Sequence, residues 1–190
     1  QTLACDLYET GNADAMYLAG MVADGTQMTK KELDTWAKAS TWHMLSEYTV
    51  PGVAAESEHA RDLALKWMDS KKESIASSGW STYTVIVSNR PDEDLDLAEI
   101  KDLLDRVVNE IDGALNRVRY TMNGFVIAVG AYVKPLLKQA KVVAKKIGTV
   151  EHEKIMLEAK VLISEIEKFL ETNPYLILAG KENAEIPHSR

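Results

Sequence analysis

Residues 116–150 read NRVRYTMNGFVIAVGAYVKPLLKQAKVVAKKIGTV, and their apolar side chains recur at steps of three and four. That spacing puts them on one face of a helix, so the stretch predicts two amphipathic helices. The first opens at Asn116. Pro135 suits the first turn of the second helix, and Gly148 is a typical helix stop.

Similar patterns precede this stretch. Asn12, Thr29 and Asp96 are N-capping residues, and each stands before an amphipathic segment. Thr29-Lys30-Lys31-Glu32 and Ser70-Lys71-Lys72-Glu73 both have the form of a capping box. Residues 81–87 are rich in β-branched side chains, which favour strands. A single strand among helices would have no partner, so we predict a buried helix there.

The sequence also predicts where the chain breaks between helices and which tryptophans are buried. A short helix is expected over 42–48, and Pro51-Gly52 is expected to break the chain after it. Trp36 and Trp67 lie on apolar stripes and are expected in the core. Trp80 follows Gly79 in a loop-like setting, which makes it a candidate for an exposed residue.

Helices of about 8 to 20 residues with short connections predict an all-α fold, an α-α superhelix of HEAT-like helical repeats rather than a four-helix bundle. We expect residues 1–180 to form a single helical-repeat domain that includes a long charged helix over 151–170. Residues 181–190 are expected to be a flexible tail. Because the chain begins at Gln1 within an apparent helix, we expect a segment to precede it.

Composition narrows the class of protein. Cys5 is the only cysteine, which fits a reducing cytoplasm and rules out a disulfide within one chain. No stretch approaches about 20 consecutive apolar residues, so no membrane span is expected. No metal site or cofactor is expected, since no two histidines have the spacing of a helical metal site. The histidines are His43, His59, His152 and His188.

Positive charge is concentrated in residues 116–150. The chain has 22 basic and 29 acidic residues, a net charge of -7, yet this stretch holds seven basic residues and no acidic one. Four lysines at steps of four, three and four share one helix face. Such a row suits a polyanion, although a solvated helix face is the alternative. The seven basic residues are Arg117, Arg119, Lys134, Lys138, Lys141, Lys145 and Lys146.

Three segments, LYETGNADAMYLAGMVAD, KELDTWAKASTWHMLSEYT and NRVRYTMNGFVIAVGAYVKPLLKQAKVVAKKIG, carry a family resemblance. Their order and spacing resemble the DNA alkylation repair family, HEAT-like-repeat proteins related to 3-methyladenine DNA glycosylases. The resemblance runs from about Leu7 to Val150 and is absent from residue 151 onward. It implies a helical solenoid that holds duplex DNA, alkylated or not, and an activity that removes N3- and N7-alkylated purines.

The resemblance also implies site residues. Active members of the family carry a Trp, an Asp one turn later and a phosphate-binding Arg. The Trp matches Trp42, and the Arg matches Arg119. The Asp position is occupied by Ser46, a neutral hydroxyl that stabilises a developing sugar cation poorly. Glu47 is adjacent but points about 100° further round the helix.

Two functions therefore remain open. One is a DNA glycosylase that acts weakly on alkylated bases through Trp42, Ser46, Glu47 and Arg119. The other is a non-catalytic helical-repeat scaffold that binds DNA, or a protein partner. In both, phosphate contacts fall to the basic residues of the lysine-rich stretch, and Ser46 favours the second. The DNA-binding candidates are Arg117, Arg119, Lys134, Lys138, Lys141 and Lys145.

Overall fold

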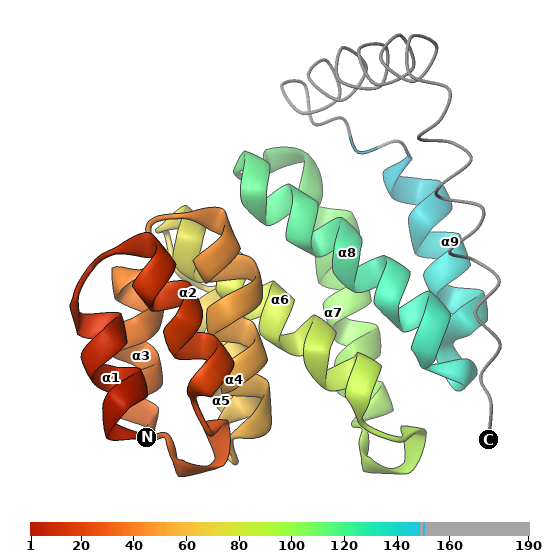
Figure 1. Ribbon diagram of the computed structural model, residues 1–190. Coiled ribbons are helices and arrows are strands. Elements are labelled where there is room, and N and C mark those ends of the chain that lie inside the picture. Colours follow the sequence, from red (N-terminus) through yellow and green to blue (C-terminus); the bar gives the residue numbers. More distant parts are fainter. Residues whose placement is uncertain (149, 151–190) are drawn as a thin grey trace, which may run out of the picture. The chain divides into compact units, whose positions relative to one another are not determined.

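The computed structural model describes residues 1–148 and 150. All regular structure among them is helical (Figure 1). The expected helix over 151–170 and the expected tail lie outside the described residues. The α-helices are α1 (Thr2–Glu9), α2 (Ala13–Val22), α3 (Lys30–Ala39), α4 (Val50–Glu56), α5 (Ala60–Met68), α6 (Glu73–Asn89), α7 (Leu97–Glu110), α8 (Asn116–Tyr132) and α9 (Leu137–Ile147).

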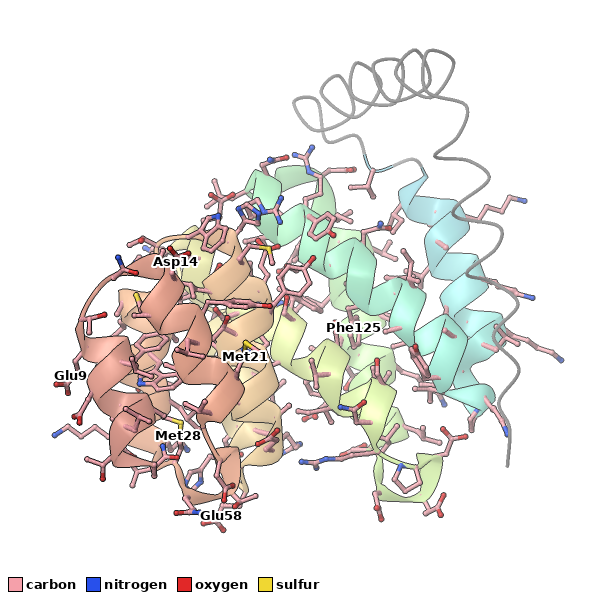
Figure 2. All side chains as sticks on the ribbon, in the orientation of Figure 1. Glu9, Asp14, Met21, Met28, Glu58 and Phe125 are labelled. Atoms are coloured by element: carbon pink, nitrogen blue, oxygen red, sulfur yellow. The ribbon has the colours of Figure 1, made fainter. Side chains whose placement is uncertain are left out.

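The central helix is α6, which packs against α3, α4 and α5 on one side and against α8 on the other (Figure 1). Two apolar cores follow from this arrangement, one among the first five helices and one among α5 to α9. Phe125 of α8 is buried in the second core, with its ring centroid 5.4 Å from that of Trp80 and 5.8 Å from that of Tyr83, both on α6 (Figure 2).

Three predicted helix starts are confirmed. The side chain of Asn12 accepts hydrogen bonds from the first turn of α2, and Asp96 does the same for α7. Thr29 and Glu32 form the predicted capping box at α3. The second predicted capping box is wrong, because the Glu73 carboxylate accepts a hydrogen bond from the backbone N–H of Arg117, 2.8 Å away, at the start of α8.

The helix predicted over 81–87 is confirmed as part of α6. Its Thr82, Thr84 and Ser88 hydroxyls donate to carbonyls one turn earlier, which satisfies polar groups inside the fold. Trp36 and Trp67 are buried as predicted. Trp80 is fully buried in the same helix, so the expectation that it is exposed is wrong. The glycine before it permits close helix packing rather than marking a loop.

The predicted break at Pro51-Gly52 is also wrong. A π-helical turn, Leu45–Thr49, runs directly into α4, and both residues lie inside that helix. Proline fits there because backbone N–H groups of a helix's first turn need no partner within the helix. The turn, called the π turn below, carries Ser46 and Glu47. Pro135 lies in a separate 3-10 turn, Lys134–Leu136, just before α9.

Within the described part of the chain, no helix is both long enough and apolar enough to cross a membrane.

Candidate functional site

Trp42 and Ser46 lie one helical turn apart, as the sequence predicts. The backbone N–H of Ser46 donates to the carbonyl of Trp42, 3.1 Å away. Trp42 is 41% exposed and its ring meets that of His43 edge-on, 5.9 Å between centroids. Ser46 is only 2% exposed, and its carbonyl accepts a hydrogen bond of 2.6 Å from the hydroxyl of Ser78 in α6. The hydroxyl position of Ser46 is therefore inside the protein, while the tryptophan beside it faces outward.

Glu47 forms a buried ion pair with Arg117. Nε of Arg117 donates to Oε1 of Glu47 at 2.7 Å, and Nη2 donates to the other carboxylate oxygen. The Glu47 side chain is 2% exposed and that of Arg117 is 20% exposed. The pair joins the π turn to the start of α8. Because both carboxylate oxygens are occupied, Glu47 presents no free carboxylate to a substrate.

The surroundings of Arg117 hold its guanidinium in place. It lies 4.6 Å from the ring centre of Tyr120, one turn later on α8, in a cation–π contact. The hydrogen bond to Glu47 raises the pKa of Arg117, which is opposed by burial. Tyr120 in turn shares a hydrogen bond of 3.4 Å with the hydroxyl of Tyr48 on the π turn. Arg117 thus serves the junction of two elements, and its charge is neutralised there.

Arg119 differs from Arg117 because it forms no ion pair with any described residue. Its Nη2 donates long hydrogen bonds to the carbonyls of Asp112 and Ala114, 3.4 and 3.3 Å away. Its Nε is buried without a partner among the residues described. No hydrogen bond or ring contact joins Arg119 to Trp42 in this part of the chain. The roles that the resemblance implies for these two residues stay predictions.

The predicted row of lysines is exposed. Lys134 lies in the 3-10 turn before α9, and three further lysines follow on α9, whose opposite face buries Ala140 and Val143. None of the four forms an ion pair with a described residue. The lysine row, as it is called below, consists of Lys134, Lys138, Lys141 and Lys145.

Four of the ten basic residues before α8 form ion pairs with described carboxylates, and Arg106, which pairs with Asp69 and Glu110, is one of them. Lys30 pairs with Asp62, Lys66 with Asp34, and Arg61 with Glu99. These pairs cancel charge locally, whereas the lysine row is unpaired among the described residues, so positive charge is densest at α9 and the turn before it. The residues described contain no cluster of three or more His, Cys, Asp or Glu side chains that could hold a metal ion.

Glu47 was predicted as a catalytic residue and Arg117 as a DNA-binding residue, but the ion pair between them was not predicted. They are 70 positions apart, and no local pattern connects them. The tyrosines beside them, Tyr48 and Tyr120, were also missed. In the sequence, these two tyrosines stand out only because they lie in predicted helices but are not part of the apolar pattern that faces the core.

Two proteins of Listeria are similar to this chain in sequence. No protein-family model matches it. The uncharacterized protein Lin0241 of Listeria innocua is 31% identical over 170 residues, which cover 87% of this chain and 72% of that protein. The uncharacterized protein Lmo0209 of Listeria monocytogenes is 31% identical over 150 residues, covering 78% of this chain and 63% of that protein.

A solved structure extends the comparison to the fold. It is described as belonging to a new family of proteins related to the HEAT-like repeat DNA glycosylases, with affinity for branched DNA structures. It matches with a TM-score of 0.77 and 39% identity, over 80% of this chain and 64% of its own length. The predicted all-α fold of HEAT-like helical repeats is thereby confirmed. The chain belongs to the family that includes Lin0241, and it is a relative of the HEAT-like-repeat DNA glycosylases.

Proposed function

We propose that this protein binds DNA, with a preference for branched DNA, and that it excises alkylated purines weakly or not at all. The observation that carries the proposal is the 39% identity to a protein whose description includes affinity for branched DNA. The lysine row and Arg119 supply the positive charge that such a partner requires. Phosphate contacts of this kind give affinity without reading base sequence, which suits recognition of DNA by its shape.

The proposal that excision is weak rests on the absence, among the described residues, of an available carboxylate beside Trp42. Ser46 stands at the position where active relatives carry Asp, and the neighbouring Glu47 is tied up by Arg117. Neither side chain offers a free charge to a developing sugar cation. A protein that keeps the DNA-binding charge and lacks the catalytic carboxylate is better suited to holding DNA than to cutting a glycosidic bond.

The test is the affinity for a four-way junction compared with that for a linear duplex of equal length, measured by fluorescence anisotropy at low salt. We expect tighter binding to the junction. Replacing Lys138, Lys141 and Lys145 together by Glu is expected to weaken binding to both DNAs by at least tenfold, since three phosphate contacts become repulsive.

A matched control carries the same charge change elsewhere. Lys31, Lys71 and Lys101 are exposed, form no ion pair with a described residue, and lie on or beside α3, α6 and α7. Their replacement by Glu is expected to change affinity much less. Equal losses in both triple variants would mean that net charge alone drives binding. Absence of binding by the unmodified chain at low salt would favour the protein-scaffold alternative.

A further inference from the structure

Two cavities adjoin along α6. The larger, about 540 Å³, lies among α2, the π turn, α4 and α6, and the smaller, about 280 Å³, lies among the π turn, α6 and α8. Tyr48 and Val85 line both, so the two cavities are neighbours, and together they are called the α6 groove. The larger cavity is within the range of about 300 to 1,000 Å³ in which small-molecule sites usually fall.

The groove walls carry exposed flat and polarizable side chains. Tyr17 is 43% exposed, Tyr48 is 51% exposed, and Met21 is 70% exposed. Figure 2 labels Met21 on the side of α2 that is turned toward α6. Aromatic rings at the surface of a DNA-binding protein are platforms on which bases stack, whatever the base sequence.

Polar groups at the groove suit an anionic chain with polar bases. Arg90 is exposed and forms no ion pair with a described residue, and Asn89 and Asn123 offer amide groups. Two carboxylates also line the groove, and only Glu47 is neutralised by an ion pair, since Glu56 is exposed. Glu47 is paired with Arg117, and Glu56 accepts a hydrogen bond of 3.0 Å from the backbone N–H of Gly25.

Two glycines inside helices leave the groove open. A Cβ atom added at Gly52 of α4 or Gly124 of α8 would meet no atom within 4 Å, and both residues line the groove. Helix packing explains glycine at two other positions: at Gly20 a Cβ would lie 2.3 Å from Thr49, and at Gly79 it would lie 2.5 Å from the backbone of Met68. Glycine in a helix interior is destabilising, so at Gly52 and Gly124 it needs a reason other than packing.

We propose that the α6 groove accepts an unpaired nucleobase at a DNA branch, stacked on Tyr48 and Tyr17, with Arg90 beside the backbone phosphate. The proposal rests on the proposed function and adds what is recognised at the branch. Helix α8 connects the two surfaces, because it contributes Gly124 to the groove, begins with the arginines and packs against α9.

The experiment compares a duplex that carries a short unpaired flap with a fully paired duplex having the same number of phosphates. The probe is the fluorescent adenine analogue 2-aminopurine at the unpaired position, whose emission falls when it stacks on an aromatic ring. The variants are Gly124→Leu, which adds a bulky side chain at a groove position where a Cβ meets no atom within 4 Å, and Tyr48→Ala, which removes a stacking surface. Ala98→Leu, which adds the same side chain on the exposed surface of α7, is the matched control.

The unmodified protein is expected to prefer the flap and to quench the probe. Gly124→Leu and Tyr48→Ala are expected to reduce that preference about 5- to 100-fold, the usual effect of losing a stacked base. Ala98→Leu should keep it. A preference that survives in both groove variants, or a flap that is bound without quenching, overturns the groove while leaving DNA binding intact. Failure to bind either DNA would overturn the proposed function itself.

Discussion

Ser46 lies one turn after an exposed tryptophan, with its side chain 2% exposed. We predict that the unmodified protein releases little or no 7-methylguanine from alkylated duplex DNA. Loss of one preorganised stabilising group costs on the order of 10² to 10³ in rate. Ser46→Asp is expected to lower the melting temperature, because the new carboxylate is buried and desolvated. A gain in release by this variant would show that a carboxylate at this buried position reaches the DNA. Robust release by the unmodified chain would mean that another group supplies the missing charge.

Breaking the ion pair between Glu47 and Arg117 should destabilise the fold. Glu47→Gln leaves the arginine charge without its carboxylate, and we expect a loss of about 2 to 3 kcal/mol in the free energy of unfolding. That is somewhat below the range of about 3 to 5 kcal/mol for a fully buried pair, because Arg117 keeps some contact with water.

Urea denaturation measures this change, and the exposed pair of Lys30 and Asp62 provides the comparison. Asp62→Asn is expected to cost less than about 1 kcal/mol, since both partners are solvated. A similar loss in the two variants would show that burial of the Glu47 pair adds nothing to stability.

The ionisation of Tyr48 reports on the contact between the π turn and α8. Its hydrogen bond with Tyr120, together with burial, raises the pKa of Tyr48 to about 12 from the ordinary value of 10. A raised pKa in the folded state means that the associated stability is complete below pH 10 and is lost between about pH 10 and 12. Phenolate absorbance followed from pH 9 upward should show late ionisation that Tyr48→Phe reduces. A titration unchanged by Tyr48→Phe would contradict it.

At the scale of the elements, glycines set how closely α6 approaches its neighbours. A Cβ at Gly79 would lie 2.5 Å from the backbone nitrogen of Met68 and 2.7 Å from the carbonyl oxygen of Ala64, so α5 and α6 could not keep their present separation. Trp80, which directly follows the glycine, is fully buried, and its ring packs against that of Phe125 on α8.

The same substitution should have opposite effects at two helix glycines. Gly79→Ala is expected to destabilise the protein by about 1 to 3 kcal/mol, because backbone atoms must move. Gly124→Ala is expected to stabilise it by about 0.5 to 1 kcal/mol, because alanine favours the helix and nothing obstructs its Cβ. Midpoints of urea denaturation compare the two. A stabilising Gly79→Ala would show that α5 and α6 can separate freely.

At the scale of the whole molecule, charge is divided unevenly. The protein carries a net charge of -7, yet residues 116–150 contain no acidic residue, and the lysine row has no ion-pair partner among the residues described. An acidic protein repels DNA at long range, so binding must depend on this local positive surface. Short-range attraction of that kind is sensitive to screening by salt.

Binding to duplex DNA should therefore weaken steeply with salt. Each phosphate that is neutralised contributes roughly -0.9 to the slope of log affinity against log salt concentration. Replacing Lys138, Lys141 and Lys145 by Gln should flatten the slope by about 2 to 3, as measured by anisotropy over a salt series. The same change at Lys31, Lys71 and Lys101 should leave the slope nearly unchanged. An unaltered slope in the first variant would place the DNA elsewhere on the surface.

Local patterns in the sequence predict most of the helices and the lysine row. Apolar residues at steps of three and four, with caps at Asn12, Thr29 and Asp96, are local signals, and a helix forms from local contacts. The lysine row follows from the same periodicity. Two local signals were misleading. Glu73 accepts a hydrogen bond from the start of α8 rather than capping its own helix. Pro51 lies in the first turn of α4, directly after the π turn, and does not break the chain.

Which candidate side chains meet depends on how the helices pack, and no local pattern predicts it. Glu47 and Arg117 come together because α6 brings the π turn and α8 to the same place, and nothing within either segment encodes that distance. The burial of Ser46 and the groove beside Tyr48 have the same origin. Contacts between residues far apart in the chain depend on how the helices pack, and packing is a property of shapes that meet only after folding.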